Sequence, residues 1–364
     1  MAEFSYLPLV EFIRDALWRH KPGRATGRAS IMIGAGFSRN ANPTSVSARP
    51  FPTWPALTEK LSLRLSSGSD PALQAAILRD AAGTSGALRL AQEYEAVFGR
   101  FQLDDFVRST VPDEDHHPGD IHTRLLSLPW ADIFTTNWDT LLERAQINVF
   151  HRAYDVVKTL SQIPSAAVPR IVKLHGTLPA HQPFIFTAED YRSYPSRFAP
   201  FVNLVQQSMM ENTFVLLGFS GDDPNFLHWS GWVRDNLGEQ APKVYLVGWL
   251  QIPPHRRRML EDLNVVPVDL AELPQGRHWP EAQKHRYAVE WFLETLRRGQ
   301  VPRASTWPST PDSMPKTLAH LEPVPNPIRV LPTKEPQPRT SFQDTAEDRA
   351  EEVYEAAKIW KVNR

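Results

Sequence analysis

Cysteine is absent from this chain of 364 residues. Without thiols the chain can form neither a disulfide framework nor a thiolate zinc site. The formal net charge of −1 gives no general attraction to nucleic acid or to anionic lipid. No uninterrupted apolar run approaches the roughly 20 residues that a membrane-spanning helix needs. These absences predict a soluble, cytoplasmic protein with no direct nucleic-acid or membrane partner.

Proline, in contrast, is abundant, with 33 residues, many of them crowded between Val301 and Arg339. Proline neither propagates a helix nor sits inside a sheet, so we expect residues 301–342 to be a linker or surface strap. Residues 343–364 then place Ala346, Ala350, Val353, Ala357 and Trp360 at helical spacing. This spacing predicts an amphipathic helix that serves assembly or begins a further domain of a longer protein.

Short β-rich apolar runs alternate with helical patterns over residues 1–300. The predicted strands are Ser30 to Ile33, Asp132 to Thr135, Asn148 to Phe150, Arg170 to Leu174, Pro183 to Phe186, Thr213 to Leu217, Val244 to Gly248 and Val265 to Val268. The predicted helices include Trp54 to Leu65, Ser85 to Phe98, Leu103 to Val111, His122 to Leu126, Asp139 to Ala145, Arg197 to Glu211 and Pro280 to Arg298. Such alternation predicts an α/β fold with a doubly wound, mostly parallel, Rossmann-like sheet and a helical insertion at about 54–128.

Unusual residues follow four of the predicted strands. They are Gly34-Ala35-Gly36-Phe37-Ser38, Thr136-Asn137-Trp138-Asp139, His175-Gly176, and Gly218 with Ser220, Asp222 and Asp223. Each motif alone also fits a structural reading, as a tight turn, a helix N-cap or a hydrogen-bonded histidine. Because ligands of doubly wound sheets bind beyond the carboxyl ends of the strands, the four motifs together predict one binding site.

The first motif does not fit the dinucleotide fingerprint of dehydrogenases. That fingerprint would need glycine two residues after Phe37, where this chain has Arg39. No acidic residue follows at the distance of a ribose-binding carboxylate, because residues 39–54 contain none. A nucleotide at this loop is therefore held differently from a dehydrogenase cofactor.

In this order and spacing, Gly-Ala-Gly-x-Ser, Thr-x-Asn-x-Asp, Leu-His-Gly and Gly-x-Ser resemble the sirtuin-like NAD-consuming domain from about Ile31 to Gly248. The stretches "LLSLPWADIFTTNWDTLLE" and "FTAEDY" are similar to those of bacterial sirtuin-like proteins of antiphage defence. The resemblance implies a sirtuin fold and NAD as the substrate.

The resemblance also implies three catalytic roles. His175 would be the base that acts on a ribose hydroxyl or on water. Asn137 would hydrogen-bond near the nicotinamide ribose or position the attacking water, and Asp139 would lie near the nicotinamide carboxamide. Cleavage of the nicotinamide–ribose bond passes through an oxocarbenium-like state, and a base with a pKa close to ambient pH assists it. Histidine has such a pKa without much tuning.

Further residues are implied to bind NAD. The loop from Gly34 to Ser38 would surround the diphosphate and adjacent ribose with backbone N–H groups, Gly218 and Ser220 would line the adenosine side, and Trp138 would wall the nicotinamide pocket. The full implied set is Gly34, Ala35, Gly36, Phe37, Ser38, Thr136, Trp138, Gly176, Gly218, Ser220 and Asp223.

The protein-deacylating sirtuins carry a four-cysteine zinc module after the His-Gly pair. Here only "TLPAHQP" separates Gly176 from the next predicted strand, and no cysteine exists, so we expect no zinc. The sequence of the acyl-lysine channel is missing with the module. Water is then the expected acceptor, which predicts an NAD glycohydrolase that forms nicotinamide and ADP-ribose, with cyclisation as a side outcome.

Two other classes of function stay open, an NAD- or ADP-ribose-sensing module without turnover and an atypical NAD-dependent deacylase. A toxic, NAD-depleting effector of abortive infection must be silent until needed. Since no sensor domain is recognisable, we expect a homo-oligomer or a regulatory partner protein, for example an ATPase or a phage-sensing protein. The histidines of "PDEDHHPGDIH", His116, His117 and His122, are expected to lie in a solvated loop and not to bind a metal.

Overall fold

The computed structural model of this chain describes residues 4–19, 26–66, 70–150, 152–179, 183–219, 221 and 223–297. Ser220, Asp222, the proline-rich segment 301–342 and the predicted helix 343–364 lie outside the described residues. Within that described part, no helix has both the length and the apolar character to cross a membrane.

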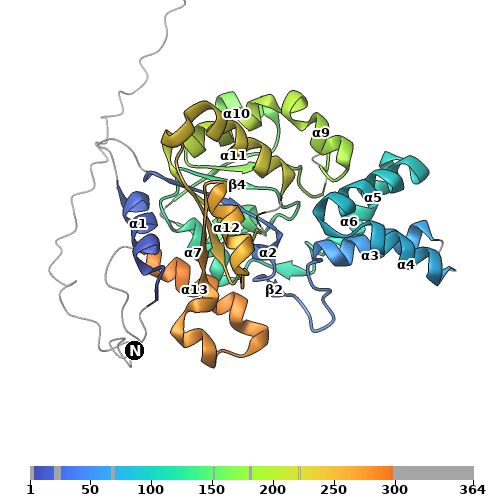
Figure 1. Ribbon diagram of the computed structural model, residues 1–364, viewed down its shortest axis with the longest axis horizontal. Helices are drawn as coiled ribbons and strands as arrows, with labels where there is room; N and C mark the ends of the chain where they lie inside the picture. The colour runs from blue at the N-terminus through green and yellow to red at the C-terminus, as the bar shows by residue number, and fades with distance from the viewer. Residues whose placement is uncertain are drawn as a thin grey trace, which may run out of the picture. The chain divides into compact units, whose positions relative to one another are not determined.

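Seven parallel strands form the central sheet in the order β5-β6-β4-β1-β7-β8-β9 (Figure 1). Their bounds are β1 Ala29–Ile33, β4 Asp132–Thr135, β5 Asp155–Val157, β6 Arg170–Lys173, β7 Thr213–Leu217, β8 Val244–Gly248 and β9 Val265–Asp269. From β1 the chain first builds one half of the sheet through β4, β5 and β6, and then the other half from β7 to β9. The predicted doubly wound α/β fold is confirmed. A separate antiparallel pair joins β2 (Asn42–Pro43) to β3 (His116–His117).

Helices cover both faces of the sheet. Successive side chains of a buried strand point to opposite faces, so the apolar side chains on each face need a layer of helices to bury them. In β1, Ile31 and Ile33 belong to one apolar cluster and Met32 to another. The first cluster draws on α1 Leu7–Trp18, α7 Asp120–Leu126, α8 Leu141–Ala145 and α13 Lys284–Leu296. The second draws on α9 Ala188–Arg197, α10 Ala199–Glu211, α11 Pro224–Leu237 and α12 Pro254–Asp262.

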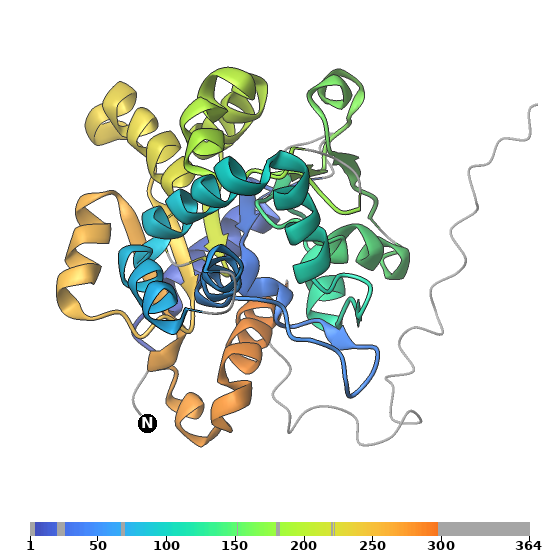
Figure 2. The same ribbon diagram turned by 90° about the vertical axis from the view of Figure 1, so that its right-hand side faces the viewer.

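Four further helices form a group of their own beside the sheet. They are α3 Trp54–Leu65, α4 Pro71–Asp80, α5 Gly83–Phe98 and α6 Arg100–Thr110, and Figure 2 shows them in front of the strands. Leu61, Leu90 and Phe106 of this group pack in a third apolar cluster, which also contains Phe184 and Phe186 of the main body. The short helix α2 (Ala35–Ser38) and six 3-10 turns complete the described elements: Gln146–Asn148, Leu160–Ser165, Gly238–Gln240, Leu270–Glu272, Pro274–His278 and Glu281–Gln283.

Two of the predicted strands are wrong. At Asn148–Phe150 the chain instead leaves α8 through a 3-10 turn, and the Phe150 side chain is 95% exposed, so the run has no buried face. In the run Pro183–Phe186 the last three residues are buried, but the run pairs with no strand of the described residues. Its backbone groups bond elsewhere: the Ile185 N–H donates to the carbonyl of His175 at 3.1 Å, and the Phe184 carbonyl accepts from Arg100.

Several elements were not predicted, among them β5, α4, α9 and α11. Strand β5 has only three residues, too few for a period of two to stand out. Helix α9 contains Pro195, and α11 begins at Pro224 with Gly231 inside it. Pro195 inside α9 and Gly231 inside α11 lower the helix propensity of these segments, whereas Pro224 stands at the first helical position, where proline is favoured. Tertiary packing overrides the low propensity.

The Arg100 guanidinium joins the helical group to the main body. Its Nη1 donates to both carboxylate oxygens of Asp190 at 3.0 and 2.9 Å, and its Nε donates to Asp104 at 2.9 Å. Asp190 also accepts the backbone N–H groups of Phe186 and Thr187, each at 3.1 Å. Both carboxylate side chains are about 5% exposed. The position of segment 183–190 therefore depends on this guanidinium.

We predict that Arg100→Ala destabilises the fold by about 3 kcal/mol, because two buried carboxylates lose the guanidinium that donates to both of them. Urea unfolding with an unchanged dependence on denaturant concentration is the measurement. Arg192→Ala is the matched control, since Arg192 pairs with Glu189 at the surface and its side chain is 72% exposed. Equal midpoints for the two variants would contradict this role of Arg100.

Candidate active site

A cavity of about 600 Å³ lies beyond the carboxyl ends of β1, β4, β6 and β7. The predicted residues in its wall are Gly34, Ala35, Gly36, Ser38, Thr136, Asn137, Trp138, Asp139, His175, Gly218 and Asp223. Of the other predicted residues, Gly176 is not in the wall, Phe37 packs in the core, and Ser220 lies outside the described residues. The structure thus brings all four sequence motifs to one cavity.

The loops after β1 and β7 approach each other at three glycines. A Cβ on Gly34 or Gly36 would lie 2.6 or 2.9 Å from the carbonyl oxygen of Gly218, closer than real Cβ contacts allow. Gly218 has a φ of +77°, a conformation that favours glycine. The glycines are therefore required by the close approach of two loops and not only by a turn.

Part of the predicted phosphate cradle is used inside the protein. The N–H of Gly36 donates to the Gly218 carbonyl at 3.0 Å, and the N–H of Phe37 donates to the Gly34 carbonyl at 3.0 Å. These two backbone groups are engaged in the structure. The expectation that the whole loop offers its N–H groups to a phosphate is corrected in this respect.

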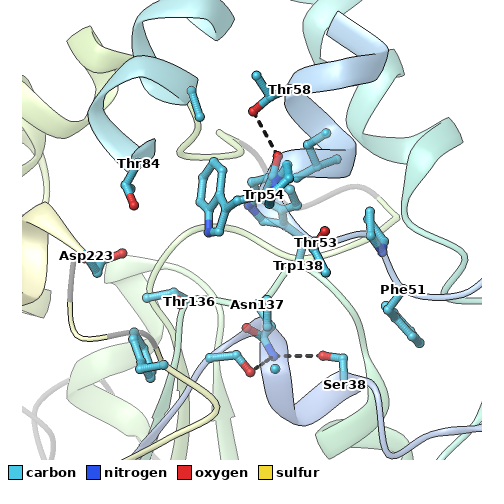
Figure 3. Close-up of a pocket in the computed structure, with 18 of the residues that line it drawn as sticks. Ser38, Phe51, Thr53, Trp54, Thr58, Thr84, Thr136, Asn137, Trp138 and Asp223 are labelled. Carbon is cyan, nitrogen blue, oxygen red and sulfur yellow. Dashed lines mark hydrogen bonds between the residues drawn. The ribbon is translucent and has the colours of Figure 1, made fainter. Parts of the chain in front are cut away.

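Asn137 is held rigidly at the base of the cavity (Figure 3). Its Nδ2 donates to the Gly34 carbonyl at 3.0 Å and to Ser38 Oγ at 2.9 Å, so both amide hydrogens are engaged. Its Oδ1 is buried and has no hydrogen-bond partner among the described residues. Since the nitrogen is fixed, the amide cannot turn, and Oδ1 keeps an unused capacity to accept a hydrogen bond.

Asp139 supports this arrangement through Ser38. Ser38 Oγ donates to Asp139 Oδ2 at 2.6 Å, and the other carboxylate oxygen accepts the backbone N–H of Leu141 at 3.2 Å. Burial raises the pKa of Asp139, while Lys173 and the Ser38 hydroxyl act in the opposite direction. Because the Ser38 hydroxyl donates its hydrogen bond to Asp139, the lone pairs of its oxygen remain to accept from the Asn137 amide. Asp139 thus acts on Asn137 by positioning Ser38.

Lys173, at the end of β6, was not predicted to belong to the site. Its side chain is 1% exposed, donates to the backbone carbonyl of Asp139 and lies 3.3 Å from Glu143 Oε1. Thr177 Oγ1 also donates to that carboxylate oxygen at 3.3 Å. This buried pair holds the Asn137–Asp139 turn against β6. In the sequence, a lysine directly after the apolar pair Ile171-Val172 of a buried strand is the signal that could have identified it.

His175 is almost completely buried in the cavity wall, with 2% of its surface exposed. The rings of Tyr191 and Tyr194 meet it edge-on at centroid distances of 5.3 and 5.6 Å, and Asn225 Nδ2 lies 3.1 Å from its Nε2. Burial lowers the pKa of His175 to about 3, although Asp190 opposes the shift. The expectation of a pKa close to ambient pH is therefore wrong, and the ring is neutral at pH 7.

The helical group supplies a wall of the cavity that sequence reasoning missed. Phe51, Trp54, Thr58 and the start of α5 line this side, and Figure 3 shows Trp54 and Thr84 across the cavity from Asn137. Arg39 is the one arginine or lysine among the described lining residues. A mostly apolar wall with a few polar groups is typical of small-molecule and cofactor sites.

The predicted solvated loop of histidines is wrong. His116 is 5% exposed and its Nδ1 pairs with the Pro112 carbonyl at 3.1 Å, and His122 is fully buried against Phe37. His117 alone of the three is exposed. Across the described residues, no group of three or more histidines and carboxylates is placed to hold a metal ion.

The part of this chain that is similar to known proteins includes the strands from β4 to β9. Residues 131–268 match the family model of the SIR2-like domain. The chain is 31% identical over 129 residues to the NAD(+) hydrolase ThsA of Acinetobacter baumannii, which covers 35% of this chain and 27% of that protein. It is 28% identical over 210 residues to the NAD(+) hydrolase ThsA of Enterococcus faecium, covering 55% of this chain and 38% of that protein.

A more distant relative is the defense-associated sirtuin 2 of Bacillus subtilis, 21% identical over 217 residues, 57% of this chain and 21% of that protein. Among solved structures, a Sir2 homolog–NAD complex aligns with a TM-score of 0.37 and 11% identity over 79% of this chain and 95% of that chain. The chain spans about a quarter to two fifths of the length of the ThsA relatives that it matches. Residues 131–268, which hold three of the four strand-end motifs, are thus the part of this chain that matches the SIR2-like domain family.

Proposed function

We propose that this chain is an NAD glycohydrolase, which cleaves NAD to nicotinamide and ADP-ribose. The observation that carries the proposal is the fixed amide of Asn137, a residue that lines the same cavity as His175 and whose buried Oδ1 has no partner among the described residues. The names of the ThsA relatives, both NAD(+) hydrolases, support it. A volume of about 600 Å³ is also within the range of sites for ligands of this size.

The proposed reaction divides the work between these two side chains. As the bond from nicotinamide to ribose breaks, its electron pair leaves with the nicotinamide nitrogen, and positive charge develops on the ribose. Asn137 Oδ1 accepts a hydrogen bond from the attacking water and holds it beside the ribose carbon. The water oxygen bonds to that carbon, and His175, neutral at pH 7, takes the released proton.

We assign the rest of the cavity to the remaining parts of NAD. The loop from Gly34 to Ser38, with Arg39 beside it, faces the diphosphate, and Gly218 lies toward adenosine. Trp138 walls the nicotinamide. Thr136 and Asp223 complete the lining, and Phe37, Gly176 and Ser220 stay predicted contacts.

In the cell, we propose that this activity depletes cytoplasmic NAD as a toxic effector of antiphage defence. The defense-associated sirtuin among the relatives supports this role by its name. An enzyme of this kind requires restraint before infection. We therefore also propose regulation by self-assembly or by a partner protein, with residues 301–364 as the contact.

The direct test is incubation of the purified protein with NAD and separation of the products. We predict nicotinamide and ADP-ribose from the wild type, and losses of at least about a hundredfold in Asn137→Ala and His175→Ala, which remove the acceptor and the base. Asn264→Ala is the matched control, because the Asn264 amide also donates to two carbonyls, at 2.9 and 3.0 Å, but outside the cavity wall.

Other outcomes of that test point to other functions. Intact NAD together with tight binding of NAD or ADP-ribose would indicate a sensing module. Turnover only with an acylated peptide, giving acylated ADP-ribose, would indicate a deacylase. Either result would contradict the proposed hydrolysis.

The buried histidine makes a prediction about pH. Because its pKa is about 3, compared with 6.5 for an ordinary histidine, the ring stays in its basic form as the pH falls. We predict that kcat/KM for NAD, which reports groups of the free protein, has no acid limb near pH 6.5. Initial rates between about pH 5 and 8 are the measurement.

Folding must be checked at each pH. The unfolded chain binds a proton at His175 below about pH 6.5 and the folded protein does not, so this group lowers stability as the pH falls toward 3. An acid limb centred near pH 6.5 in fully folded protein would contradict a buried histidine as the base.

The regulatory proposal predicts that deletion of residues 301–364 changes the assembly state, the activity, or both. Light scattering and NAD turnover of the full and shortened chains are the measurements. An unchanged mass together with unchanged turnover would remove this segment as the regulatory contact.

A further inference from the structure

Asn225 lies directly behind the histidine of the cavity. Its Nδ2 is 3.1 Å from His175 Nε2, and both residues are 2% exposed. Asn225 belongs to the first turn of α11, whose N-cap is Asp223, and it is not part of the cavity wall. The asparagine therefore contacts the imidazole and not the space in which a ligand would lie.

The other contacts of the His175 ring do not determine which of its two nitrogens carries the proton. Tyr191 and Tyr194 meet it edge-on and fix the plane of the ring, but apolar contacts do not decide which nitrogen carries the proton. Nδ1 has no hydrogen-bond partner among the described residues. Since Nε2 faces Asn225, Nδ1 is the nitrogen available to a ligand.

We propose that Asn225 is a positioning residue that stabilises each tautomer of His175 by the orientation of its amide. A side-chain amide donates at one end and accepts at the other, and a half-turn exchanges the two. With Nδ2 toward the ring, as in this structure, Nε2 accepts and the ring proton lies on Nδ1. With Oδ1 toward the ring, Nε2 keeps the proton and the Nδ1 lone pair is free to act as the base.

The half-turn is open to this amide, in contrast to that of Asn137. The contact with His175 is the one side-chain hydrogen bond of Asn225 with the described residues, so the rotation disrupts no other bond. The Asn137 amide is instead fixed by two acceptors. The two asparagines therefore differ in role: Asn137 is a fixed acceptor, and Asn225 is a partner of His175 that can turn.

The inference rests on the proposed NAD hydrolysis, because it assigns the nitrogen that serves as the base. When Nδ1 takes the proton of the attacking water, the O–H bond breaks, an N–H bond forms, and the ring becomes a cation. Nε2–H then donates to Asn225 Oδ1. In a ring so deeply buried, this charge-assisted hydrogen bond offsets part of the cost of the cation.

The test uses the full chain and two substitutions of one residue. Asn225→Leu removes both ends of the amide, and we expect kcat to fall at least about tenfold while KM for NAD stays within about twofold. Asn225→Asp keeps an acceptor toward Nε2 and should retain most of the wild-type kcat. Asn236→Leu is the matched control, an exposed asparagine of the same helix whose Nδ2 bonds only to the Trp232 carbonyl.

Nitrogen-15 NMR of labelled histidine reads the tautomer without any turnover. We expect the proton of His175 on Nδ1 in the ligand-free wild type and on Nε2 in Asn225→Asp. The same ring tautomer in both proteins, or an unchanged kcat in folded Asn225→Leu, would overturn the proposal. If the tautomer shifts as expected but the wild type leaves NAD intact, the positioning role stands and the proposed function fails.

Discussion

The site depends on the close approach of the loops after β1 and β7. The Gly36 N–H bonds to the Gly218 carbonyl at 3.0 Å, and a side chain on either Gly34 or Gly36 would collide with that oxygen. This contact lies where the two halves of the sheet meet, at the β1–β7 pair. It places the Gly34 carbonyl where the Asn137 amide can reach it, at 3.0 Å.

From this contact the polar groups of the cavity follow in order. Asn137 is held by Gly34 and Ser38, Ser38 by Asp139, and the turn that carries Asp139 by the buried Lys173. Three buried polar atoms around this chain of bonds have no partner among the described residues: Asn137 Oδ1, Trp138 Nε1 and Glu143 Oε2. Of these, Asn137 Oδ1 belongs to the amide that the bonds hold in place. A polar group held in place by its neighbours before a ligand binds is preorganised, so little reorganisation is needed when a ligand arrives.

The parallel sheet and the four motifs of the cavity could be predicted from the sequence, each for a different reason. The parallel sheet follows from alternating apolar runs and helical patterns, and the four motifs follow from their places at strand ends. Pro183–Phe186 misled because a buried apolar run has the composition of a strand, whereas its backbone bonds go to Arg100 and His175. The low pKa of His175 and its contact with Asn225 could not be predicted, because burial and a neighbour 50 residues away exist only in the folded chain.

The central claim is that NAD lies in this cavity with its nicotinamide ribose against Asn137. A crystal structure of the His175→Ala variant soaked with NAD tests it most directly, since the loss of the base slows turnover while the rest of the wall is kept. The account predicts NAD with a ribose hydroxyl or a bound water within hydrogen-bond distance of Asn137 Oδ1. NAD bound elsewhere, or with its nicotinamide ribose remote from Asn137, would contradict it.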